Sequence, residues 1–150
     1  MDALWFRRQK ADNPDASFVD WEFSAGTVGF KKAGAPAQAG QKLASVVGVN
    51  IPPRHAGLTT DIVHWSTGIS WGLVAGTLTA TKSGLPAIPA GVVAGTVAFG
   101  TSYAALGQLG IYKPIWTYDA ETLWKDFSAH MVFGITTGVA LGLLQAVKSR

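Results

Sequence analysis

Hydrophobic and polar positions are unevenly distributed along the 150 residues of the chain, because most of the charged side chains lie in its first part. Three windows contain no Asp, Glu, Lys or Arg: residues 62–81, 83–112 and 127–147. Each window reaches the ~20 apolar residues that a helix needs to cross the hydrocarbon core of a bilayer. The pattern predicts an all-α fold, a polytopic membrane helix bundle with three transmembrane helices at about 60–81, 86–107 and 120–147.

Composition supports this prediction. Charged residues make up 14% of the chain and hydrophobic residues 48%, whereas soluble domains carry about 25% charged residues. The alternative is a soluble α protein with three buried helices. Helices that are hydrophobic on all sides must be covered, and the rest of this chain supplies too few polar faces to cover three of them. The absence of cysteine excludes disulfides and thiol chemistry.

Residues 1–57 are expected to form a polar, basic segment in the cytoplasm or at the membrane interface, followed by the transmembrane bundle at 58–150. Met1–Phe6 lacks the apolar stretch of a signal peptide. Because two arginines follow it, this stretch resembles the last turn of a membrane helix. Two hypotheses follow. Either the natural chain begins further upstream with another span, or this stretch is a short interfacial anchor.

Two elements are expected within that segment. The stretch 13–34 mixes turn formers, charges and aromatic residues such as Phe30, which suggests that it lies on the membrane surface through its rings. Pro36 suits the first position of a helix and Gly48 suits a C-terminal cap. The apolar residues between them have helical spacing, so we predict a short amphipathic helix that cannot cross the membrane.

Lysine and arginine counts predict the orientation, since cytoplasmic segments carry an excess of both. The N-terminal segment and the loop between the second and third predicted helices share one side and carry nine of these residues, against three on the other side. We therefore expect the N-terminal segment in the cytoplasm. The net charge of +3 then reflects topology and attraction to anionic lipid. No dense basic cluster predicts a nucleic-acid partner.

An internal repeat lies inside the predicted spans. The pattern HxxxGxxxGxxxG occurs twice, beginning at His64 and at His130, and a shorter GxxxG lies in the second predicted helix. Small residues at four-residue spacing let helix backbones approach closely. We predict that these glycine zippers pack helices within the chain or between copies; the alternative is that they make room for a flat cofactor. The residues concerned are Gly68, Gly72, Gly76, Gly91, Gly95, Gly134, Gly138 and Gly142.

An aspartate precedes each of these histidines by about one helical turn. Asp61 and His64, like Asp126 and His130, therefore share a helix face. The topology places all four at the cytoplasmic ends of their helices, where they could bind a metal such as Zn, Fe or Mn, hold a haem through the two imidazoles, or transfer protons. The structural alternative places the aspartates in first helical turns, where the helix dipole favours carboxylates.

Other chemistry is not indicated. The sequence contains no GxSxG, HExxH or GxxxxGK[ST] motif, so we assign no catalytic residue and do not expect an enzyme. Hydroxyl groups within the spans are expected to hydrogen-bond within or between helices. Asp119 is the expected N-cap of the third helix.

Several short runs distributed over most of the chain carry a family resemblance: Asp20–Ser24, Pro36–Gln38, Val63–Trp65, Tyr112–Trp116 and Asp126–His130. With them the chain resembles uncharacterised small polytopic membrane proteins of actinobacteria, distantly similar to the YagU-like inner-membrane proteins. The resemblance implies a bacterial cytoplasmic (inner) membrane location and a further span upstream of Met1. It implies no settled activity and no catalytic residues.

Together these observations predict a small integral membrane protein of structural or accessory role. Its expected partners are the lipid bilayer and either further copies of itself or a larger membrane complex. The alternative function is proton, ion or metal handling by the paired Asp/His residues.

Overall fold

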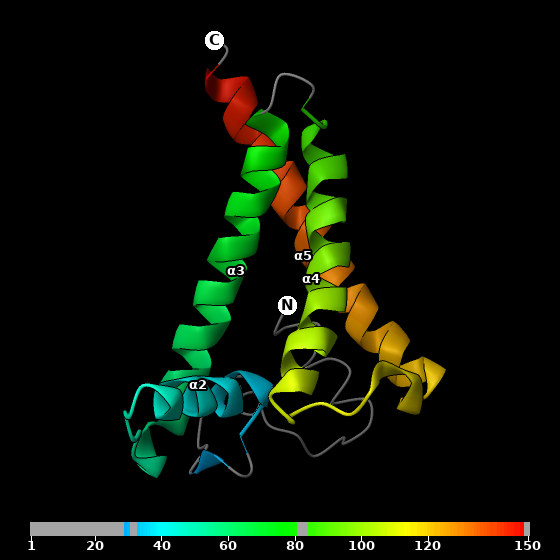
Figure 1. Ribbon diagram of the computed structural model, residues 1–150. Coiled ribbons are helices and arrows are strands. Elements are labelled where there is room, and N and C mark those ends of the chain that lie inside the picture. Colours follow the sequence, from blue (N-terminus) through cyan, green and yellow to red (C-terminus); the bar gives the residue numbers. More distant parts are fainter. Residues whose placement is uncertain (1–28, 31–32, 81–83, 149–150) are drawn as a thin grey trace, which may run out of the picture. The chain divides into compact units, whose positions relative to one another are not determined.

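The computed structural model describes residues 29–30, 33–80 and 84–148. Over these residues the chain is all-α (Figure 1). Its helices are α2 (Ala35–Val46), α3 (Ala56–Ala80), α4 (Ala87–Gln108) and α5 (Ala120–Lys148), with short 3-10 helices at Pro53–His55 and Ile115–Thr117. The expectations for Met1–Phe6 and for most of 13–34 lie outside the described residues.

Local signals at the helix ends act as expected. Gly48 adopts a φ of +76°, in the left-handed region that favours glycine after a helix. Its amide donates to the Ser45 carbonyl at 3.1 Å, and the Val49 amide donates to the Ala44 carbonyl at 2.9 Å. These bonds end α2. The predicted start of α3 near Thr60 is wrong, since this helix begins at Ala56.

Within the described residues, two helices, α4 and α5, are long and apolar enough to cross a membrane, and the third predicted span, α3, is not confirmed. Although α3 has 25 residues, it contains Asp61, His64 and seven serines and threonines. Because these polar side chains are spread along α3, none of its 18-residue stretches is as apolar as the most apolar stretches of α4 and α5.

The chain divides into two compact units. The first comprises Met1–Thr67 and Ala105–Lys113, and the second comprises Gly68–Ala104 and Pro114–Arg150. Of the three boundaries, those after Thr67 and Ala104 fall within helices, and the one after Lys113 lies between α4 and the second 3-10 helix. The predicted division after residue 57 stays a prediction. The first unit extends into α3 because α2 packs on the first turns of that helix.

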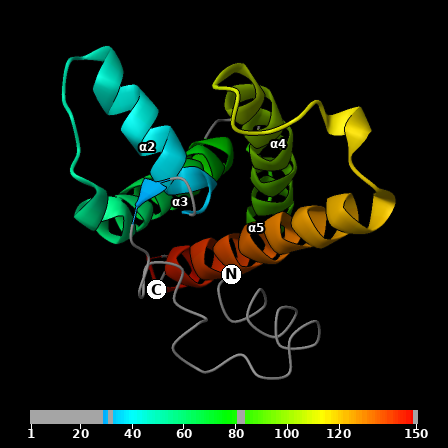
Figure 2. The same cartoon turned by 90° about the horizontal axis from the view of Figure 1, so that it is seen from below.

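The first unit is built on close packing between α2 and α3 (Figure 2). A Cβ atom added at Gly40 would lie 2.5 Å from Thr59 Cγ2 and 2.9 Å from Val63 Cγ2. A small core beside this contact contains Phe30, Ala33, Ala37 and Ala56. The expectation that the Phe30 ring lies on the membrane surface is therefore wrong, because this side chain is buried inside the unit.

The second unit is held together by α4 and α5, which lie side by side. The buried residues of α4 are Ala90, Gly91, Ala94, Gly95, Ala98 and Tyr103, and those of α5 are Ala129, Gly134 and Gly138. Apart from Tyr103, these are glycines and alanines. The interior between the two helices is thus made of small residues, and the larger apolar side chains point elsewhere.

Candidate functional site

The Asp126–His130 pair on α5 is the most conspicuous polar feature of the second unit. His130 Nδ1 lies 3.3 Å from Asp126 Oδ1 and 3.0 Å from the Asp126 backbone oxygen. Both side chains are largely buried, at 17% and 16% exposed. The four-residue spacing therefore places carboxylate and imidazole together on one helix face, as the sequence predicts.

This arrangement selects one tautomer of the imidazole. Both neighbours of Nδ1 are hydrogen-bond acceptors, so Nδ1 carries a proton and donates it. In the neutral ring, Nε2 is then the basic nitrogen. A carboxylate that orients an imidazole in this way is common behind metal-bound and proton-transferring histidines. The pair can therefore accept a proton or supply one nitrogen ligand.

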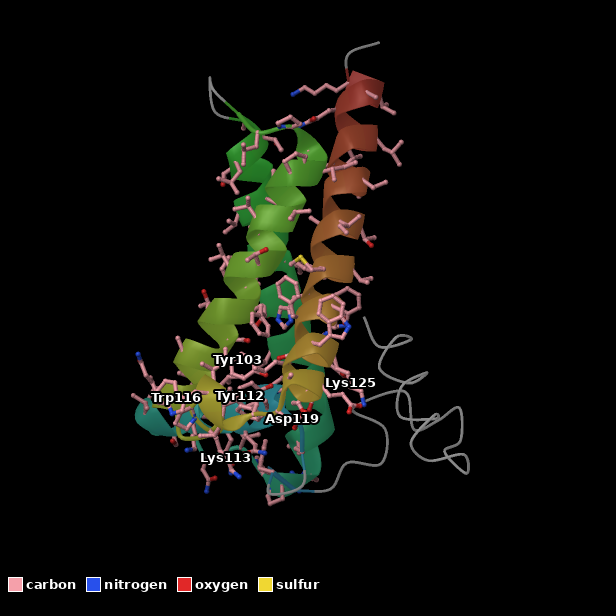
Figure 3. All side chains as sticks on the ribbon, turned by 90° about the vertical axis from the view of Figure 1, so that its right-hand side faces the viewer. Tyr103, Tyr112, Lys113, Trp116, Asp119 and Lys125 are labelled. Atoms are coloured by element: carbon pink, nitrogen blue, oxygen red, sulfur yellow. The ribbon has the colours of Figure 1, made fainter. Side chains whose placement is uncertain are left out.

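A cluster of aromatic rings lies beside His130. Phe99 on α4 packs edge-to-face on His130, with ring centroids 5.7 Å apart, and also contacts Phe127 at 5.4 Å. Tyr103, labelled in Figure 3, lies 5.1 Å from Phe99 and 5.4 Å from Tyr118. Sequence reasoning missed Phe99 and Tyr103. The available signal was their four-residue spacing in a helix otherwise rich in small residues.

The other predicted pair belongs to the first unit. Asp61 and His64 lie on neighbouring turns of α3, and both side chains are partly buried. Across the described ranges, no group of three or more His, Asp or Glu side chains is arranged to hold a metal ion. Convergence of all four residues on one metal or haem stays a prediction, because the two pairs belong to different units.

The proposed first-turn location of the aspartates is wrong. Because α3 begins at Ala56, Asp61 lies in its second turn, and the first turn contains no acidic residue. In α5 the acidic residue of the first turn is Glu121, and Asp126 lies a turn further along. Since the helix-dipole effect falls off within the first turn, it does not explain either aspartate.

Four glycines mediate the contact between α4 and α5. A Cβ atom at Gly91 would collide with the backbone oxygen of Gly134 and lie 2.8 Å from the Gly138 nitrogen. At Gly95 it would lie 2.6 Å from the His130 oxygen, and at Gly138 2.6 Å from the Ala87 oxygen. Backbone atoms cannot move aside as side chains can. Only glycine therefore fits at Gly91, Gly95, Gly134 and Gly138.

The remaining predicted packing glycines have more space. A Cβ atom at Gly68 or Gly76 would only reach ordinary contact with side chains of α5, at 3.9 and 4.0 Å, and nothing lies within 4 Å at Gly72. At Gly142 the nearest atom is Ala87 Cβ, at 3.6 Å. A packing role for these four residues stays a prediction.

Asp119 caps α5, as expected, and is labelled in Figure 3. The Thr122 amide donates to Asp119 Oδ1 at 2.8 Å, and the Thr122 hydroxyl donates to Oδ2 at 2.9 Å. These two bonds, the amide first, hold the pKa of the Asp119 carboxyl below its ordinary value.

Hydroxyl groups within the helices bond to the carbonyl groups of their own helix. Such bonds are formed by Thr67, Thr77, Thr96, Ser102 and Thr136, over 2.7 to 2.9 Å. These hydroxyls are therefore occupied structurally, as expected. A hollow of about 170 Å³ lies at the end of α2, and its lining residues, Ser45, Gly48, Val49 and Asn50, include no ionisable side chain.

Comparison with known proteins adds no assignment: no family model, curated protein or solved structure matches the chain. The resemblance to YagU-like proteins therefore stays a prediction.

Proposed function

We propose that the chain is a small integral membrane protein of structural or accessory role, with α4 and α5 spanning a bacterial cytoplasmic membrane. One observation carries this proposal: the residues between the two helices are small, whereas the apolar side chains on their outer surfaces are large. Its interior consists almost entirely of Gly and Ala, whereas large apolar side chains are exposed along both helices: Ile88, Val93, Val97, Val132, Ile135, Val139, Leu143 and Leu144.

This distribution suits lipid as the surrounding medium. In water, burying large side chains drives folding, and an extended apolar surface is unfavourable. In a bilayer the lipid tails are as apolar as leucine, so helices associate through close contact of small residues instead. The four glycines of the α4–α5 contact supply that mode of association.

The chain offers a direct test because it contains no cysteine. Leu85 precedes α4 and Thr117 follows it, and both are exposed. If α4 spans the membrane with the loop after it in the cytoplasm, as the lysine and arginine counts predict, a membrane-impermeant maleimide should label Leu85→Cys in intact bacterial spheroplasts. It should label Thr117→Cys only after permeabilisation. Release of the protein by alkaline carbonate, or labelling of both sites in intact spheroplasts, would contradict the proposal.

The accessory role requires a partner, and the open glycines of α3 favour a second copy of the chain or a larger complex. Gly72 leaves space on its helix surface, in contrast to Gly91 and Gly134. Disulfide cross-linking of Gly72→Cys in native membranes tests this part, with Leu144→Cys as the control for random collision. Equal cross-linking of the two variants would argue against a specific self-association through α3.

A second candidate function is proton handling, favoured by the buried Asp126–His130 pair on an apolar helix. Ionisable residues within membrane helices are costly and commonly functional. In liposomes containing a trapped pH-sensitive dye, the wild type should then dissipate a proton gradient, and both His130→Ala and Asp126→Asn should abolish this flux. Identical traces for the three proteins would eliminate this candidate. Metal analysis and an absorption spectrum of the purified protein test the metal and haem versions.

A further inference from the structure

The apolar face of α2 changes its surroundings halfway along the helix. Gly40 and Leu43 of α2 and its C-cap residue Val47 follow one another at three- and four-residue spacing, so they lie on a single face. Gly40 is in tight contact with Thr59 and Val63 of α3. Beyond it, Leu43, Val46 and Val47 are 56%, 81% and 75% exposed. One continuous apolar stripe is therefore covered by α3 in its first half and left uncovered in its second.

A hydrogen bond holds α2, and with it this stripe, beside the C-terminal end of α4. Lys42 Nζ donates to the backbone carbonyl of Leu109, immediately after the end of α4. A cation at the C-terminal end of a helix satisfies its unpaired carbonyls and interacts favourably with the dipole. Within the first unit, α2 is thus tied to the start of α3 through Gly40 and to the end of α4 through Lys42.

Charge in the first unit complements a lipid headgroup layer. Its described residues include the cationic side chains of Lys42, Arg54 and Lys113, all exposed, and a single carboxylate, that of Asp61. Anionic headgroups of a cytoplasmic leaflet attract basic groups of this kind. A helix with a basic residue beside an apolar stripe is typical of helices that lie in the membrane interface.

We propose that α2 is an interfacial helix whose Leu43, Val46 and Val47 side chains insert into the boundary between headgroups and acyl chains. The partner of this surface is the bilayer itself. This inference rests on the proposed function, since it is the membrane crossing of α4 that places the Leu109 carbonyl, and α2 with it, at the interface. Insertion of α2 would fix the depth of the end of α4 in the membrane.

Quenching of a fluorophore on single-cysteine variants tests the insertion. The full-length protein is reconstituted in vesicles of phosphatidylcholine and phosphatidylglycerol, with an environment-sensitive maleimide dye on Val47→Cys. The matched control is Ser45→Cys, because Ser45 is exposed on the polar side of the same helix. A lipid spin-labelled near its headgroup should quench the dye at position 47 several times more strongly than the dye at position 45. Aqueous iodide should give the reverse order.

A third variant separates this inference from the proposed function. Val97→Cys places the dye on the exposed side of α4, where a lipid spin-labelled near the end of its acyl chain should quench it if α4 spans the bilayer. If position 97 is quenched by that lipid but position 47 is quenched by iodide, α4 spans and the inference about α2 is overturned. Protection of position 47 from both quenchers overturns it as well, since protein then covers the stripe. Failure at position 97 overturns the proposed function.

Discussion

Gly91 on α4 and Gly134 on α5 contact each other through their backbones, each lying where a Cβ atom of the other would have to be. Interhelical contact this close is possible only without side chains. It brings main-chain atoms into van der Waals contact, which is the main source of helix association in lipid. The α4–α5 pair therefore depends on a few glycines rather than on a conventional hydrophobic core.

Substitution of either glycine by alanine should open this contact. We expect Gly91→Ala and Gly134→Ala each to reduce stability by roughly 3 kcal/mol, at the upper end of typical overpacking costs, because the obstacle is backbone. Thermal unfolding of the purified protein in mild detergent measures the effect. Gly100→Ala on α4 and Gly72→Ala on α3 are the controls, since nothing lies within 4 Å of a Cβ atom at either position. Equal losses in all four variants would show that the close contact is not what stabilises the pair.

The Asp126–His130 pair should stabilise α5 where Phe99 packs against it. Asp126→Ala removes one of the two acceptors of His130 Nδ1 and leaves the backbone oxygen as the other. We expect a loss of about 1 kcal/mol, the usual net value of one hydrogen bond, and a smaller loss for Asp126→Asn, which keeps an acceptor. A double-mutant cycle with His130→Ala measures the coupling directly. Strictly additive losses would mean that the two side chains do not interact energetically.

The sequence pattern predicts the helices of this chain more accurately than their contacts. The charge-free windows correspond to α3, α4 and α5, and the caps at Gly48 and Asp119 follow from local backbone chemistry. The pairing of Asp126 with His130 also follows from local chemistry, since four-residue spacing alone brings them together. The other pair, Asp61 and His64, shows the limit of this reasoning, because convergence of the two pairs depends on tertiary arrangement.

The roles of the glycines show the same limit. Gly72 and Gly138 occupy equivalent positions of the repeated motif, yet only Gly138 is in contact with another backbone. The difference depends on which helix lies opposite, and a motif carries no information about that. The prediction that the Phe30 ring lies on the membrane surface is wrong for a related reason. Its place in the core of the first unit depends on packing with Ala56, which is distant in sequence.

The contact between α2 and α3 should also be sensitive to side-chain size, with a local consequence. Gly40→Val would place its side chain against Thr59 and Val63, at distances where neighbouring atoms must move. We expect α2 to detach from α3 while the α4–α5 pair is unaffected. Amide hydrogen exchange should therefore increase in residues 35–46 and stay unchanged in α5. Gly34→Ala is the control, since its nearest neighbour would be an ordinary contact at 3.6 Å. Faster exchange throughout the protein would instead indicate global destabilisation.

The cap at Asp119 gives the stability of α5 a specific pH dependence. Its carboxyl pKa is lowered in the folded protein by the two bonds from Thr122, so the folded state favours the charged form. A depressed folded pKa adds stability that is fully present above the unfolded value of about 3.9 and is lost as the pH falls through the lower folded value. The wild type should therefore melt a few degrees above Asp119→Ala at pH 7, and this difference should narrow below about pH 4. Asp119→Asn keeps a capping oxygen without titrating, so its difference from Asp119→Ala should not change with pH in this range. A gap between wild type and Asp119→Ala that is constant down to the acid limit would show that the carboxylate charge does not contribute.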